Sequence, residues 1–141
     1  MSDVNEWNKR IIAEFRANGG AVGGQFAGVP LLLLHTTGAK SGQPRINPLV
    51  YHTDDDRLVV IASKAGAPTN PDWYYNTLAN PIVTVEVGGE QFQARATVAE
   101  EPERTHLYDQ MAAAWPQFEQ YRRNAGRTIP VLVLTRIEDV G

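Results

Sequence analysis

The chain has 141 residues, a length typical of one domain, and 43% of them are hydrophobic, which is enough for a buried core. Its net charge of −3 and its pI of about 5.6 exclude a global basic field that would attract nucleic acid, so any bound anion must meet a local cluster. Cysteine is absent, which excludes disulfides, thiolate nucleophiles and Cys-ligated metals and is typical of a reducing cytoplasm.

The first 28 residues are expected to form an N-terminal helix and a glycine-rich lead-in to one domain spanning residues 1–141. Residues 4–18 place Val4, Trp7, Ile11 and Phe15 on one helical face, and the pattern ends at Gly19-Gly20. Mixed charges on the polar face allow only weak peripheral contact with a membrane. We therefore expect the apolar face to pack over the barrel, an active-site mouth or another subunit.

No segment has the length of a membrane span. The longest apolar run, residues 29–34, is too short to cross a bilayer, and residues 1–8 are polar and acidic, unlike the start of a signal peptide. We expect a cytoplasmic location, which would allow peripheral contact with the inner face of the membrane.

Six apolar or alternating segments predict strands joined by hairpin-length links. They are residues 31–36, 46–52, 58–63, 82–87, 91–98 and 131–137. Asp54–Asp56 and Gly88-Gly89 are typical hairpin turns. Helices are expected from Asn70-Pro71, with Asn70 as the N-cap, and from Pro102, with a break at Pro116. The pattern favours an α+β antiparallel barrel over a parallel sheet.

The segment Thr36–Arg45 joins two predicted strands and has the composition of an anion-binding loop. Its glycines free the backbone to turn N–H groups inward, while Lys40, Ser41 and Arg45 add side-chain donors. The order of residues does not match a Walker A loop, so nucleotide hydrolysis is not expected. From composition alone, an ordinary solvated hairpin loop is an equally good interpretation.

A second segment, residues 62–73, runs from a strand end into a helix. Small residues there let a flat ring approach the backbone, and Trp73 offers an aromatic cover. The alternative is a plain connection in which Trp73, Tyr74 and Tyr75 serve ordinary packing, and the segment by itself favours that alternative.

Familiar catalytic arrangements are missing from the sequence. The three histidines lack metal-ligand spacing, so no metal site is expected, and no serine lies in a G-x-S-x-G motif. An enzyme with so few reactive side chains would need a cofactor for the difficult chemical step.

Three ordered blocks carry a family resemblance that covers residues 30–134. They read LLLLHTTGAKSGQPRINPLVY, IASKAGAPTNPDWYYNTLANP and RTIPVLVL. In these blocks the chain resembles the deazaflavin-dependent nitroreductases, the coenzyme F420-dependent reductases of actinobacteria and some other prokaryotes. The resemblance implies a split β-barrel of the flavin mononucleotide (FMN)-binding type, with F420 as the cofactor.

The resemblance also implies a set of cofactor-binding residues. Lys40, Ser41, Gly42 and Arg45 would bind the phosphate end of the tail. Backbone contacts to the deazaflavin ring would come from Ala62, Ser63, Lys64, Gly66 and Ala67, with Pro71 and Trp73 beside the ring or tail. Many relatives carry arginine where this chain has Ala39, so one cationic contact is missing here.

Members of such a family pass hydride from reduced deazaflavin to a quinone, an enone or a nitroaromatic acceptor. As catalytic candidates we nominate Tyr121 as a hydrogen-bond donor to the acceptor and Tyr74 as a weaker choice. Two alternatives stay open: an FMN enzyme on the same barrel and a non-catalytic deazaflavin carrier. The chain is expected to act as a monomer or homodimer.

Overall fold

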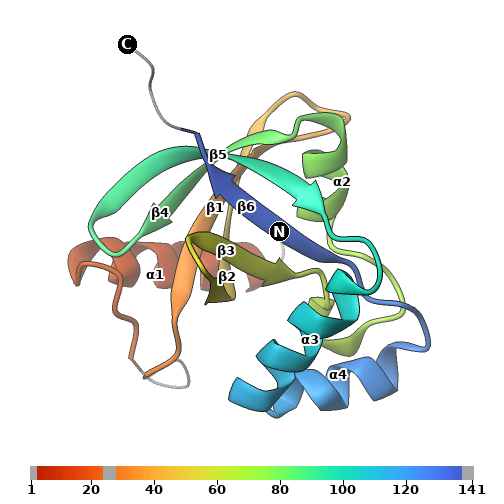
Figure 1. The fold of residues 1–141 in the computed structure, drawn as a ribbon. Helices are drawn as coiled ribbons and strands as arrows, with labels where there is room; N and C mark the ends of the chain where they lie inside the picture. Colours follow the sequence, from red (N-terminus) through yellow and green to blue (C-terminus); the bar gives the residue numbers. More distant parts are fainter. Residues whose placement is uncertain (1–2, 24–27, 138–141) are drawn as a thin grey trace.

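The computed structural model describes residues 3–23 and 28–137, which form a closed six-stranded barrel with helices on its outside (Figure 1). The strands are β1 (Leu31–Thr37), β2 (Pro44–Asp54), β3 (Arg57–Ile61), β4 (Ile82–Val87), β5 (Glu90–Val98) and β6 (Val131–Arg136). The helices are α1 (Asp3–Ala17), the 3₁₀ turn η2 (Lys64–Gly66), α2 (Asp72–Ala79), α3 (Glu103–Ala114) and α4 (Gln117–Ala125). The predicted α+β antiparallel barrel is confirmed.

Every neighbouring pair in the strand order β1-β2-β3-β6-β5-β4 is antiparallel, and β1 closes the barrel by pairing with β4. Both predicted hairpin turns are present. Asp54 pairs with Arg57 across the first, and Val87 pairs with Glu90 across Gly88-Gly89. Asp55 has a φ of 57°, a left-handed conformation that a short polar side chain tolerates better than most.

Alternation along the strands divides the core into an inside and two outer layers. The barrel interior takes Leu32 and Leu34 of β1, while Leu31 and Leu33 face outward and pack with Phe15 of α1. β3 and β6 are also buried on both faces, because α3 and α4 cover their outer side. Burial on both faces explains why these strands read as continuous apolar runs instead of alternating ones.

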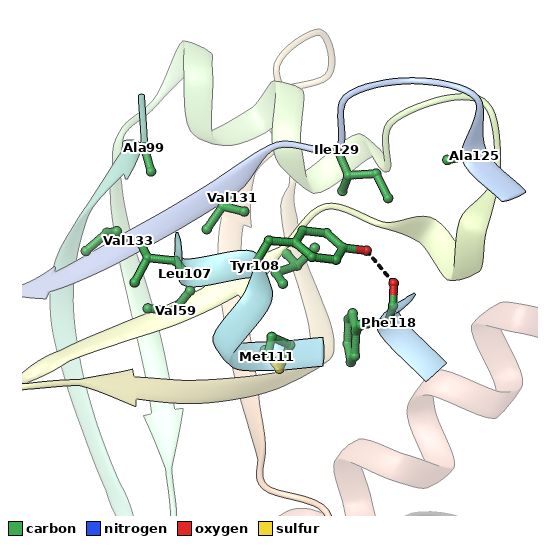
Figure 2. Close-up of a cluster of buried hydrophobic side chains, with 11 residues drawn as sticks. Val59, Ala99, Leu107, Tyr108, Met111, Phe118, Ala125, Ile129, Val131 and Val133 are labelled. Atoms are coloured by element: carbon green, nitrogen blue, oxygen red, sulfur yellow. Dashed lines mark hydrogen bonds between the residues drawn. The ribbon is translucent and has the colours of Figure 1, made fainter. Parts of the chain in front are cut away.

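The outer layer under α3 and α4 contains one buried polar link (Figure 2). The hydroxyl of Tyr108 donates to the backbone carbonyl of Phe118 at 2.7 Å, and Tyr108 is fully buried. Burial raises the pKa of the Tyr108 phenol to about 12, so the hydroxyl stays a donor at neutral pH. This bond joins α3 to α4 across the predicted break at Pro116.

One helix prediction needs correction. α2 begins at Asp72 with Pro71 at the N-cap position, so Asn70 does not cap it; the Asn70 side-chain oxygen instead accepts a hydrogen bond from Arg127. α3 ends at Ala114, which leaves Trp115 at its C-cap, half-buried beside the cluster that Leu107 and Tyr108 enter.

α1 lies against the outside of the barrel, one of the three positions expected for it. Phe15 is buried, and Arg16 and His35 both bind Glu86, at 2.7 Å and 2.5 Å from the same carboxylate oxygen. The side chains of Val4 and Trp7, and residues 24–27 of the lead-in, lie outside the described part. Within that part, no helix has both the length and the apolar character needed to span a bilayer.

Candidate functional site

The β1–β2 loop (residues 38–43) is folded by hydrogen bonds of its own. Gly38 donates to the Gln43 carbonyl at 2.8 Å, and Gly42, with a φ of +70°, donates back to the Gly38 carbonyl at 2.9 Å. The amide of Gln43 donates to Ser41 Oγ at 3.1 Å. Among the described residues, the amides of Lys40 and Ser41 have no acceptor, so the tip of the loop offers two free N–H donors.

Asn76 of α2 attaches this loop to the barrel. Its Oδ1 accepts from the amide of Ala39 at 2.9 Å, and its Nδ2 donates to Thr36 Oγ1 at 3.1 Å. Asn76 is 6% exposed and Thr36 5%, so the bond between these two side chains is buried, while the bond to the amide of Ala39 is partly buried at the wall of the loop. The side chain therefore fixes the position of the loop relative to α2.

A cleft of about 650 Å³ opens between the β1–β2 loop and α2, the two elements that lie together at the upper right of Figure 1. It is lined by Gly38, Ala39, Lys40, Ser41, Arg45, Asp72, Tyr75 and Asn76. The structure thus brings together three of the four residues assigned to the cofactor tail, Lys40, Ser41 and Arg45, while Gly42 does not line the cleft.

The charges of the cleft suit an anion, with one exception. Lys40 and Arg45 are exposed, and neither pairs with a carboxylate among the residues described. Two cationic side chains and two free amides form the donor set that binds phosphate or carboxylate groups in proteins. Asp72 adds one negative charge on the α2 side, which weakens the attraction and favours a hydroxyl donor at that position.

The β3–α2 loop (residues 62–71), assigned to the ring, is only partly buried and does not line this cleft. Ala62, Ser63, Gly66 and Pro71 are buried, Ala67 is half-buried and Lys64 is exposed. Trp73, on the first turn of α2, is only 5% exposed and packs inside the barrel, so it offers little surface to a ring. The ordinary-packing alternative accounts for the position of Trp73.

Arg127 lies just before β6 in the chain, and its side chain binds the β3–α2 loop. Its guanidinium donates to the carbonyls of Ala62, Ala67, Thr69 and Ser63, at 3.1, 3.1, 2.9 and 3.4 Å, and to the side-chain oxygen of Asn70. A planar guanidinium with five N–H donors is suited to hold several carbonyl groups at once. One side chain thus binds five oxygen acceptors of the loop.

Tyr121 of α4 lies next to the loop as well. A Cβ built on Gly66, whose φ is +85°, would lie 3.2 Å from the Cα of Tyr121, so glycine is needed for this approach. The ring of Tyr121 packs edge-on to Phe118 with centroids 5.2 Å apart. Tyr74 does not line the cleft near Lys40; its neighbour Tyr75 does.

Sequence reasoning missed three residues that build the site: Asn76, Tyr75 and Arg127. Arg127 is the first residue of the block RTIPVLVL, which supported the family resemblance without suggesting a role for the arginine. Asn76 falls within the second block and carried no local pattern of its own. No sequence signal marked either residue, because each meets its partner across a long stretch of chain.

Comparison with solved structures defines the class of protein. HutZ, a haem storage protein from Vibrio cholerae, superimposes with a TM-score of 0.60 at 17% identity over 94% of this chain and 92% of that one, which shows a common split-barrel fold. A domain-swapped dimer that is 34% identical matches with a TM-score of 0.70 over 93% and 96% of the two chains. The F420-H2 dependent reductase FDR-A matches with a TM-score of 0.68 at 37% identity over 74% and 93%.

The family follows from the sequence matches. The model of the F420H(2)-dependent quinone reductase family matches residues 7–136. An F420H(2)-dependent quinone reductase of Mycobacterium tuberculosis is 37% identical, covering 95% of this chain and 99% of the relative. The chain belongs to the F420H(2)-dependent quinone reductase family and is an F420-dependent oxidoreductase. The family membership and the cofactor expected from the three blocks are confirmed.

Proposed function

We propose that this chain binds reduced F420 with the anionic tail in the cleft beside Lys40 and Arg45 and the ring along the β3–α2 loop, and reduces quinones. The observation that carries the proposal is the cleft of about 650 Å³ itself. It is lined by Lys40 and Arg45, which pair with no carboxylate of the described residues, and by the loop whose Lys40 and Ser41 amides have no acceptor among those residues. When bound, reduced F420 supplies the hydride for a two-electron reduction.

The protein's part in the reaction is positioning. The tail contacts of Lys40, Ser41, Gly42 and Arg45 would hold the cofactor. The backbone of Ala62, Ser63, Lys64, Gly66 and Ala67 would border the ring, with Pro71 and Trp73 beside the ring or tail. Tyr121 would donate a hydrogen bond to the acceptor oxygen as negative charge develops there, and Tyr74 is the weaker candidate. The position of Tyr121 beside Gly66 supports this assignment.

We extend the proposal to acceptor range, assembly and location. Quinones are the principal acceptors, and enones and nitroaromatics are accepted because the reaction needs only an activated, electron-poor acceptor. A homodimer is supported by the domain-swapped relative, and size-exclusion chromatography with light scattering tests it. A cytoplasmic location is supported by the lack of cysteine in the chain.

The decisive experiment titrates the purified chain with oxidised F420 and, separately, with FMN, and then follows oxidation of reduced F420 by menadione. Micromolar binding of F420, weaker binding of FMN and menadione-dependent oxidation are expected. Failure to bind F420 would falsify the proposal. Tight F420 binding without accelerated oxidation by any quinone, enone or nitroaromatic would indicate a carrier instead.

A further inference from the structure

We infer that Arg127 is the positioning residue of the ring site: its guanidinium fixes the backbone of the β3–α2 loop so that two amides of that loop face the cofactor ring. The inference rests on the proposed function, because it assigns the ring to this loop. Arg127 is not among the residues that line the tail cleft.

The directions of the peptide groups carry the inference. In a trans peptide the C=O of one residue and the N–H of the next point to opposite sides. Arg127 binds the carbonyls of Ala62 and Ser63, so the N–H groups of Ser63 and Lys64 point away from the guanidinium. Among the described residues neither of these two amides has an acceptor. They form a pair of adjacent donors suited to the carbonyl oxygens and ring nitrogens of a deazaflavin.

The loop needs an external support of this kind. Lys64 has a φ of +48°, in the left-handed region that costs a non-glycine residue energy, and Gly66 follows at +85°. Such a conformation persists only where the surroundings hold it. Within the loop the backbone supplies two short-range bonds, from Gly66 to Ser63 and from Ala67 to Lys64. Arg127 binds the carbonyls of Ala62, Ala67 and Thr69, and it shares the carbonyl of Ser63 with the amide of Gly66.

Arg127 also lies close in the chain to the residue assigned to the acceptor. It follows α4 in the chain, and α4 carries Tyr121 against Gly66 of the same loop. A displacement of the loop would therefore change both the ring donors and the spacing between the ring and Tyr121. This predicts a loss of cofactor affinity together with a loss of turnover at saturating cofactor.

The test compares Arg127→Lys and Arg127→Met with the control Arg123→Met. Lysine keeps the charge but cannot hold several carbonyls in one plane. Arg123 is on the neighbouring helix, with a side chain 71% exposed and a carboxylate oxygen of Glu119 4.0 Å away. For both Arg127 variants we expect at least a tenfold weaker affinity for oxidised F420, an altered circular dichroism of the bound deazaflavin and a lower kcat at saturating reduced F420. The KM for menadione should stay within about threefold, and the control should match the unaltered chain.

Hydrogen exchange separates positioning from general stability. In the ligand-free Arg127→Met variant, amides of residues 62–70 should exchange faster while those of the six strands keep their protection. Unchanged exchange in residues 62–70, or unchanged F420 affinity and circular dichroism in both variants, would overturn the inference while leaving the proposed function intact. Faster exchange throughout the barrel would overturn it too. No F420 binding by the unaltered chain would overturn the proposed function first and the role of Arg127 with it.

Discussion

We expect the Asn76 side chain to affect both the stability of the fold and the affinity of the cleft proposed to bind the cofactor tail, and two substitutions separate these effects. Asn76→Ala removes the bonds to both Ala39 and Thr36, whereas Thr36→Val removes only the second and keeps the shape of the side chain. Ala39 lies in the loop that supplies the donors of the cleft. Only Asn76→Ala therefore releases the loop.

The expected losses of stability and of F420 affinity can be worked out from these hydrogen bonds. A buried hydrogen bond contributes about 0.5–1.5 kcal/mol net, and leaving one buried partner unsatisfied costs about 1–3 kcal/mol. Both variants should therefore lose about 1–3 kcal/mol, or about 3–9 °C in Tm at about 3 °C per kcal/mol for a domain of this size. Freeing the loop adds a cost on binding, since fixing one residue's backbone takes about 1–2 kcal/mol. F420 affinity should then fall about tenfold in Asn76→Ala, because tenfold corresponds to about 1.4 kcal/mol.

Thermal unfolding followed by circular dichroism and fluorescence titration with oxidised F420 measure the two quantities. Asn76→Ala should lose both stability and affinity, while Thr36→Val should lose stability and bind F420 within about twofold of the unaltered chain. Equal affinity in all three proteins would refute the reasoning that Asn76 preorganises the cleft. An equal loss of affinity in both variants would show that binding follows global stability instead.

Three further outcomes test the site and the fold. Lys40→Ala and Arg45→Ala should each weaken F420 binding and flatten its dependence on added salt, since exposed charges are screened by ions; normal titrations across a salt series in both variants would refute the tail assignment. Tyr121→Phe should lower kcat/KM for menadione about tenfold, the effect of losing a hydrogen bond of about 1.4 kcal/mol, with unchanged F420 affinity. A loss confined to cofactor affinity would contradict its place on the acceptor side. The hydrogen bond from Arg16 lowers the pKa of Glu86 in the folded chain, so the stability that ionised Glu86 contributes is present above its unfolded pKa and is lost as the pH falls through the lower folded pKa. Glu86→Gln should therefore flatten the acid fall of Tm below about pH 5, and an unchanged acid limb in unfolding scans would argue against this pair.

The sequence by itself determined the strands, both hairpins and the segments that become helices. Hydrophobic periods of two and of about 3.6 residues are local, and turn residues such as Gly88-Gly89 act over a few positions. The same local reading marked Lys40 and Arg45 as an anion-binding pair, because a loop between two strands keeps its residues near one another. The family emerged from three ordered blocks for a similar reason, since each block is continuous in the chain.

Only the tertiary structure decided which distant groups complete the site. Arg127 meets the β3–α2 loop across 57 to 65 positions of sequence, and Asn76 meets Ala39 across 37. Barrel closure brings these residues together, and no local pattern records which donor will find which carbonyl. A distant partner also explains why Asn70 does not cap α2. Its side-chain oxygen accepts a hydrogen bond from Arg127, a residue that the sequence near α2 does not contain. Trp73, for which the segment by itself favoured ordinary packing, is buried inside the barrel, where its large apolar ring is removed from water; which neighbours it packs against was decided by the barrel.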